Sequence, residues 1–140
     1  LKESGDIYTA RGQFEEGLVF YLKALQFTLE LYLNDDVAAK PDYAPDVDAL
    51  LSRFDVTTLP METQISSILY YEQVGAYSKA EDLLFDMLDT NAGDAETMAS
   101  LIEIGTAFYE RLQRQSDAAL VAGHLSRDEV ARGLREVQSY

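Results

Sequence analysis

The chain has 140 residues and a mass of 15.7 kDa, a size that predicts one domain with a sizeable core. Its formal net charge of -14 argues against binding to nucleic acid or to an anionic membrane surface, because such partners need a positive footprint. Cysteine is absent, which excludes disulfides and thiolate metal sites, and no apolar run reaches the length of a membrane span. We therefore expect a protein that is not a membrane protein and that prefers a basic or neutral partner. The lack of cysteine leaves the redox compartment open, so a cytoplasmic location is the default expectation.

The opening residues predict two antiparallel helices joined at Gly12. Small and apolar side chains recur at three- and four-residue steps on both sides of this glycine. Glycine commonly ends a helix because it adopts a positive φ without a steric penalty. Gly5 and Gly17 stand inside the two helices, where glycine costs roughly 1 kcal/mol relative to alanine. We therefore expect the helices to approach closely there, with Tyr8 and Tyr21 filling the adjacent space.

This spacing resembles the signature of the tetratricopeptide repeat (TPR). The positions that carry the resemblance are Gly5, Tyr8, Gly12, Phe14, Gly17, Tyr21 and Ala24. Gly17 replaces the alanine that the family usually has, and the family's first bulky aromatic residue falls on Leu1. The resemblance implies an all-α fold in which helical hairpins stack as a short right-handed superhelix.

A polar, proline-containing connector is expected over residues 34–60, after a first hairpin that covers residues 1–33. Asn34, Asp35 and Asp36 end the second helix. Pro45 is a plausible start for a short helix that runs to about Arg53, with an apolar face formed by Val47, Leu50, Leu51 and Phe54.

A second hairpin is expected over residues 61–90, with one helix from Met61 to Val74 and a turn at Gly75. Its pattern repeats that of the first hairpin at a constant offset, which is longer than the TPR period of about 34 residues. The two hairpins are thus separated by the inserted short helix. The matching residues are Tyr71, Gly75, Tyr77, Ala80, Leu84 and Leu88.

Residues 94–140 predict a long helix followed by a terminal capping helix. Asp94 is a good N-cap for a helix to about Gln115, and a helical turn is expected over residues 117–121. Ser126 and Glu129 form a capping-box pattern for a last helix from Arg127 to about Gln138. The polar back of that helix fits the closing element of a repeat stack.

About seven helices are therefore expected in a single domain of residues 1–140. The tail pattern Phe-Tyr-Glu-Arg-Leu, followed by His-Leu-Ser-Arg-Asp-Glu-Val, also resembles an uncharacterised bacterial family of TPR-like proteins.

No pattern of enzyme chemistry emerges from the sequence. His124 is the only histidine, and nothing near it resembles a nucleophile elbow. The segment from Asp89 to Asp94 has the glycine and acid of a calcium loop in the wrong order, so it predicts a turn between helices. We therefore expect a non-enzyme with no catalytic residues, metal site or cofactor.

The TPR resemblance implies a protein-interaction module whose groove is lined by the first helix of each hairpin. A groove that mixes acidic and apolar residues favours a basic amphipathic peptide or helix. Asp6 stands where carboxylate-binding TPR proteins carry asparagine, so capture of a C-terminal carboxylate is not expected. The predicted groove residues are Lys2, Asp6, Thr9, Glu62, Ile65, Leu69, Glu72 and Gln73.

Two alternatives stay open at this point. The inserted helix would bury Ile65 and Leu69 if it packed over them, and the groove would then be blocked. The second alternative is that the protein is a self-associating structural protein, a homo-oligomer without a dedicated ligand groove.

Overall fold

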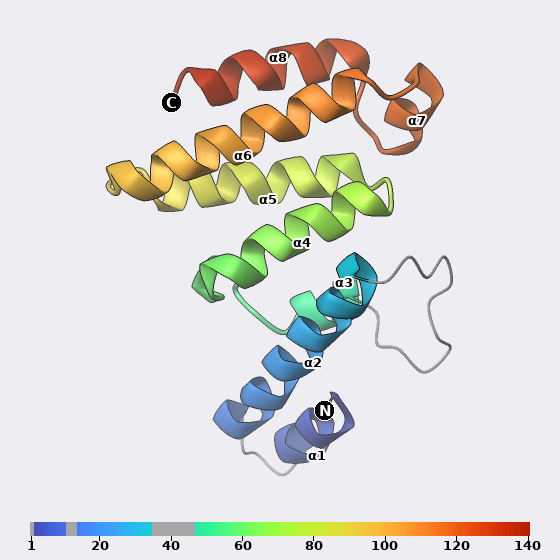
Figure 1. The fold of residues 1–140 in the computed structure, drawn as a ribbon. Coiled ribbons are helices and arrows are strands. Elements are labelled where there is room, and N and C mark those ends of the chain that lie inside the picture. The colour runs from blue at the N-terminus through green and yellow to red at the C-terminus, as the bar shows by residue number, and fades with distance from the viewer. Residues whose placement is uncertain (1, 11–13, 35–46) are drawn as a thin grey trace. The chain divides into compact units, whose positions relative to one another are not determined.

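The computed structural model describes residues 2–10, 14–34 and 47–140, without the side chains of residues 7–10, 14 and 15. Within these residues the chain forms eight α-helices, one 3-10 helix and no strand (Figure 1), which confirms the all-α prediction. The predicted turn at Gly12 and the predicted helix start at Pro45 lie outside the described residues. The structure divides into two compact units, residues 1–70 and residues 71–140.

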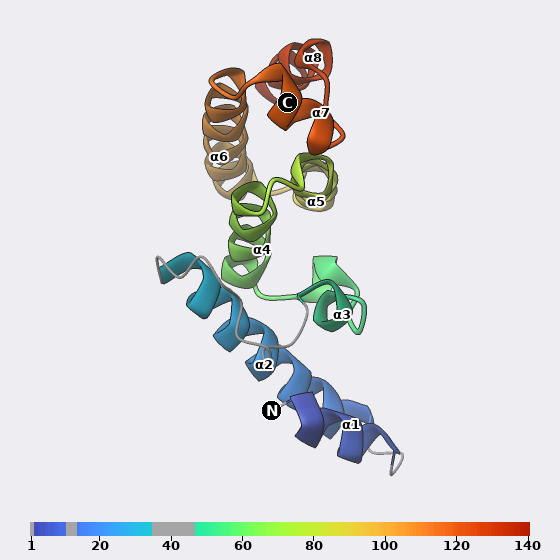
Figure 2. The same cartoon turned by 90° about the vertical axis from the view of Figure 1, so that its right-hand side faces the viewer.

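The N-terminal unit begins with two helices that lie side by side, α1 (Lys2–Ala10) and α2 (Phe14–Asn34), as Figures 1 and 2 show. A Cβ atom added to Gly5 of α1 would lie 2.9 Å from the ring of Tyr21 and 3.0 Å from the backbone oxygen of Gly17. Ordinary side chains do not fit in such a space. The close approach expected at Gly5 and Gly17, with Tyr21 beside it, is therefore confirmed, whereas the side chain of Tyr8 lies outside the description.

Short helices cover the middle of α2. The helix α3 (Val47–Leu51) buries Val47, Leu50 and Leu51, and it packs against α2. The 3-10 helix η1 (Val56–Thr58) follows, where the sequence predicts only a break. Its N-cap is Asp55, whose carboxylate accepts a hydrogen bond from the backbone N–H of Thr57 at 3.2 Å.

The helix α4 (Met61–Gln73) runs through the division between the units, so the predicted second hairpin also crosses this division. Pro60 precedes the helix, as expected for a residue whose φ is fixed near the helical value. The predicted end at Val74 differs from the observed end by one residue.

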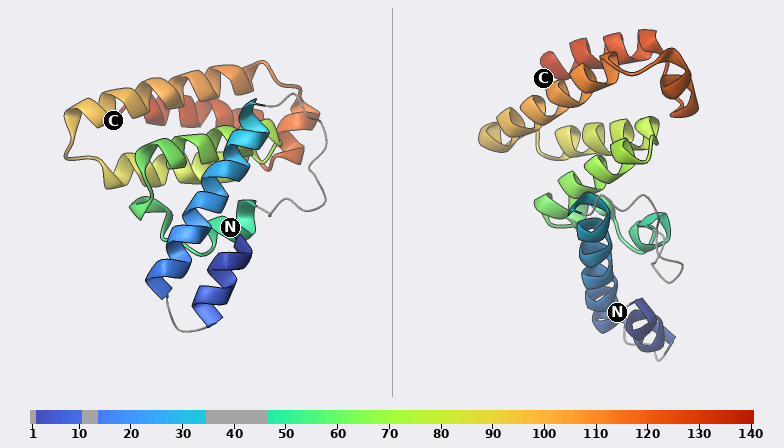
Figure 3. Two further views of the ribbon diagram at one scale, coloured as in Figure 1. Left: turned by 60° about the horizontal axis from the view of Figure 1, so that its bottom comes forward. Right: turned by 45° about the vertical axis from the view of Figure 1, so that its right-hand side comes forward.

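The C-terminal unit contains α5 (Tyr77–Thr90), α6 (Ala95–Gln113), α7 (Asp117–Ala122) and α8 (Arg127–Gln138). The helix α6 lies alongside α5 and α8 in Figures 1 and 3. A Cβ atom on Gly105 of α6 would lie 2.9 Å from Val137 of α8 and 3.1 Å from Leu84 of α5. The three helices therefore meet at this glycine.

Local signals at the helix ends match the structure. The capping box of α8 is complete, because the Ser126 hydroxyl accepts from the N–H of Glu129 while the Glu129 carboxylate accepts from the N–H of Ser126. Asp94 caps α6 through the N–H of Thr97. The helical turn expected over residues 117–121 is a short helix, α7, which Ser116 caps.

None of the described helices is both long and apolar enough to cross a bilayer.

Candidate functional site

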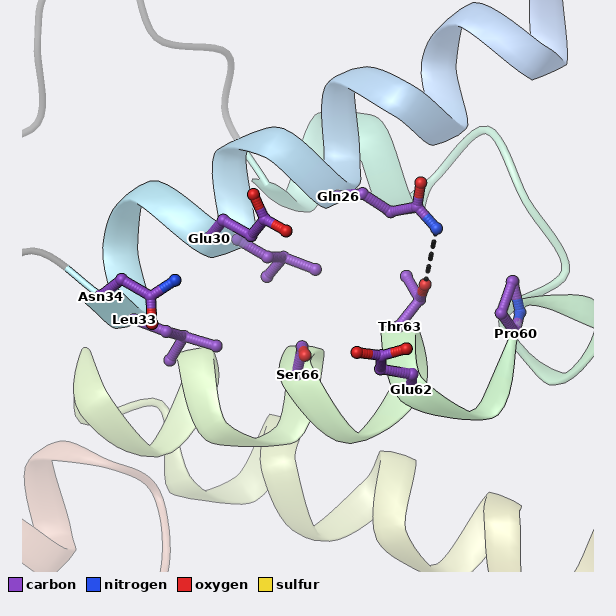
Figure 4. Close-up of a pocket in the computed structure, with 9 residues that line it drawn as sticks. Gln26, Glu30, Leu33, Asn34, Pro60, Glu62, Thr63 and Ser66 are labelled. Carbon is purple, nitrogen blue, oxygen red and sulfur yellow. Dashed lines mark hydrogen bonds between the residues drawn. The ribbon is translucent and has the colours of Figure 1, made fainter.

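The N-terminal unit contains a groove between α2 and α4, with a cavity volume of about 460 Å³. Figure 4 shows side chains from both helices that point into the same space. Most of the lining residues are polar. They are Gln26, Leu29, Glu30, Leu33 and Asn34 from α2, Pro60 just before α4, and Glu62, Thr63 and Ser66 from α4.

The α2 wall of the groove has a polar rim and an apolar inner side. Gln26, Glu30 and Asn34 recur every four residues, so they lie on one stripe of the helix, and all three are exposed. Leu29 and Leu33 lie on the adjacent inner stripe, where Leu29 is buried and Leu33 is half-buried. With a rise of 1.5 Å per residue, this wall extends over roughly 12 Å.

The α4 wall comes from the first turns of that helix. Glu62 is exposed and stands in the first turn, where the positive end of the helix dipole stabilises a carboxylate. Thr63 is buried, and its hydroxyl accepts a hydrogen bond from the Gln26 amide at 3.3 Å, which links the two walls. Farther along, the rings of Tyr32 and Tyr70 meet edge to face with centroids 5.0 Å apart.

The electrostatics of the groove depend on two carboxylates from opposite walls, Glu30 and Glu62. Figure 4 shows both directed into the groove. Neither carboxylate forms a hydrogen bond or an ion pair with another residue that the structure describes. Among the described residues, no cationic side chain lines the groove, so the negative charge of these two carboxylates favours a positively charged group there.

Among the predicted groove residues whose side chains the structure describes, only Glu62 lines this cavity. Lys2 and Asp6 instead pair with each other at 2.8 Å within α1. Asp6 also accepts a hydrogen bond from Tyr21 at 2.5 Å, and Arg53 approaches it at 3.7 Å. The hydrogen bonds from Lys2 and then Tyr21 lower the pKa of Asp6. Because Tyr21 belongs to α2, its bond to Asp6 links α1 to α2.

The other predicted groove residues are distributed over both units. Ile65 is half-buried and Leu69 is 38% exposed, so the described residues do not bury Leu69 as the blocked-groove alternative requires. The side chain of Thr9 lies outside the description. In the C-terminal unit, Glu72 accepts two hydrogen bonds from Arg111 at 2.8 and 2.7 Å, and Gln73 is exposed.

The sequence reasoning missed the α2 wall, because it placed the groove on the first helix of each hairpin. The available signal was the stripe of Gln26, Glu30 and Asn34, which interrupts a helix that is otherwise rich in apolar residues. Periodicity separates the polar stripe of a helix from its apolar face, but it does not identify which other helix packs beside that stripe.

A second hollow, of about 310 Å³, lies in the C-terminal unit between α5 and α8. Glu81 lines it and accepts a hydrogen bond from the Tyr109 hydroxyl. Burial raises the pKa of Glu81, the bond from Tyr109 opposes this, and the neighbouring carboxylates raise it further. The remaining lining residues are Asp82, Phe85, Glu129, Arg132, Gly133 and Glu136.

The described residues contain no group of three or more histidine, aspartate or glutamate side chains that could hold a metal ion.

Comparison with known proteins identifies the family of the chain. A model described as a family of unknown function, DUF6483, matches residues 40–140. No curated protein and no solved structure matches the chain. The matched range includes the α4 wall of the groove, whereas α1 and α2 precede it.

Proposed function

We propose that this chain, which belongs to the DUF6483 family of unknown function, is a protein-interaction module whose α2–α4 groove holds a basic segment of a partner protein. The observation that carries the proposal is the pair of carboxylates, Glu30 and Glu62, that face one groove without a cationic partner among the described residues. A lysine or arginine side chain of the partner would neutralise them.

The rest of the lining favours a peptide segment over a free cation. Leu29 and Leu33 offer apolar contacts beside the carboxylates, so a segment that alternates basic and apolar residues fits both parts of the groove. The net charge of -14 adds long-range attraction, which speeds the encounter with a basic partner at low salt. Nucleic acids and anionic membranes are disfavoured for the same reason.

We extend the proposal to the architecture and the setting of the protein. Its hairpins stack in the manner of TPR proteins, and the close packing of Gly5 against Tyr21 supports this for the first hairpin. The proposed role is that of a cytoplasmic scaffold without enzymatic activity, because binding through such a groove needs neither a cofactor nor a catalytic group.

Charge reversal in the groove tests this function. The probe is a fluorescein-labelled peptide of four leucines and four lysines in alternating order, and the readout is fluorescence anisotropy at low and high salt. In the Glu30→Lys/Glu62→Lys variant, two attractions become repulsions, so we expect binding to weaken about tenfold or more at low salt.

The matched control is Glu103→Lys/Glu110→Lys, which changes the net charge equally at two exposed positions of α6. We expect a much smaller loss of affinity in this control, caused by the lower overall charge alone. Equal losses in both variants would show that the groove has no special role.

Self-association is a second candidate, because α2 exposes large apolar side chains. Val19 is 52% exposed and Phe27 is 58% exposed. Antiparallel pairing of two α2 helices through these residues would place Lys23 against its own copy and Glu16 against Glu30, so like charges would meet. We therefore expect a monomer at micromolar concentration in sedimentation equilibrium. A dimer that Phe27→Ser disrupts would favour self-association instead.

A further inference from the structure

We infer that the segment held in the α2–α4 groove is an extended chain and not a helix, an inference that rests on the proposed function. An extended chain carries backbone N–H and C=O groups that need hydrogen-bond partners, whereas a helix satisfies these groups internally. The side chains of the groove therefore indicate which conformation fits it.

The groove supplies unused hydrogen-bonding groups along its length. Asn34 and Ser66 form no side-chain hydrogen bond with any residue that the structure describes. Gln26 uses one amide hydrogen for Thr63, which leaves its carbonyl oxygen available. A primary amide presents both donors and an acceptor, so it can pair with a backbone N–H and C=O at once.

The spacing of these groups fits an extended backbone. Gln26 and Asn34 stand two helical turns apart, roughly 12 Å along α2. An extended chain covers that length with roughly four residues, at about 3.3 Å each. Successive side chains would then alternate between the apolar inner side at Leu29 and Leu33 and the carboxylate rim at Glu30.

The composition of the lining disfavours a helix. A groove that receives an amphipathic helix presents a broad apolar surface, because a helix with its side chains is about 10–12 Å wide. The apolar residues here are Leu29, Leu33 and Pro60, and the other lining residues are polar or charged. A bound helix would leave those polar groups desolvated without backbone partners.

Two peptides of identical composition test the inference on the wild-type protein. One has the alternating order Leu-Lys-Leu-Lys-Leu-Lys-Leu-Lys, and the other has the helical order Leu-Lys-Lys-Leu-Leu-Lys-Lys-Leu. We expect the alternating peptide to bind about fivefold more tightly, as two or more additional hydrogen bonds would produce. Equal affinity, or tighter binding of the helical order, would overturn the inference.

Variants that remove the hydrogen-bonding side chains provide the second arm. The Asn34→Ala/Ser66→Ala variant is expected to bind the alternating peptide about fivefold more weakly and to bind the peptide of helical order with unchanged affinity. Gln138→Ala/Ser100→Ala removes an exposed amide and an exposed hydroxyl outside the groove, and we expect it to change neither affinity. Equal weakening of both peptides by the groove variant would contradict the backbone pairing.

The same experiments separate this inference from the proposed function. If Glu30→Lys/Glu62→Lys affects neither peptide more than its matched control does, then the groove function itself is wrong and the inference fails with it. If that variant weakens both peptides while their affinities for the wild type are equal, the function stands and the extended conformation is rejected.

Discussion

Glu81 shows how the environment of one residue couples the C-terminal unit to pH. Burial raises the pKa of its carboxyl group, and the carboxylates of Asp82, Glu129 and Glu136 raise it further against the hydrogen bond from Tyr109. Burial, and then the bond to Glu81, also raise the pKa of the Tyr109 hydroxyl, so this tyrosine stays a hydrogen-bond donor. The ionised form of Glu81 therefore costs stability in the folded protein.

The sign of the pH dependence follows from linkage. A carboxyl group whose pKa is higher in the folded protein than in the unfolded chain binds protons more readily when folded. As the pH falls from neutral towards the ordinary glutamate value, Glu81 becomes protonated and its contribution to stability increases. Above the raised pKa the cost of the charge is present in full.

We predict that Glu81→Gln raises the free energy of unfolding at neutral pH, because the amide is uncharged and keeps an oxygen that accepts from Tyr109. The advantage over the wild type is expected to shrink as the pH falls through the raised pKa. Denaturant unfolding at several pH values measures this. Glu110→Gln, on an exposed position of α6, is the control and should change stability little. A variant less stable than the wild type at neutral pH would show that the ionised carboxylate is favourable there.

At the scale of the element, the N-terminus of α8 depends on its capping box. Ser126→Ala removes the hydroxyl that accepts from the N–H of Glu129, so we predict a loss of about 1 kcal/mol in the free energy of unfolding. Ser100→Ala in the middle of α6 is the control, where alanine is the better helix former and no loss is expected. Similar effects of the two substitutions would mean that the cap contributes nothing beyond helix propensity.

Helix positions could be predicted from the sequence because their signals are local. The range of α8 is as predicted, and α6 ends two residues before its predicted end. Ser126 and Asp94 are caps whose partners stand three residues along the chain, so no tertiary information is needed to recognise them. Short helices are harder to predict, because few residues contribute to their pattern. The sequence predicts a helical turn at α7 but only a break at η1.

The groove could not be predicted in the same way. Hydrophobic periodicity identifies the buried face of a helix, and it does not identify which other helix covers that face. Gln26 and Thr63 are far apart in sequence, and only the fold of the N-terminal unit brings them within 3.3 Å. The repeat resemblance places the groove on the first helix of each hairpin. The predicted groove therefore includes Glu62 of α4 and omits Glu30 and Asn34 of α2.

At the scale of the whole molecule, the proposed function needs both the negative net charge, which attracts a partner, and the groove, which binds it. The net charge of -14 attracts basic partners over a distance set by the ionic strength, about 10 Å at 0.1 M salt. In the proposed function, the pair of carboxylates in the groove then selects where such a partner binds. Attraction without the groove would produce salt-sensitive binding at many places on the surface. The location of binding therefore distinguishes specific binding in the groove from non-specific attraction to the acidic surface.

Residue-level mapping by NMR tests this central claim most directly. The uniformly ¹⁵N-labelled protein is titrated with the alternating leucine and lysine peptide at low salt, and backbone amide shifts are followed. The account predicts that the largest shifts fall on residues 26–34 and 60–66 and that added salt reverses them. Shifts spread evenly over the acidic surface, or concentrated on α5 and α8, would contradict it.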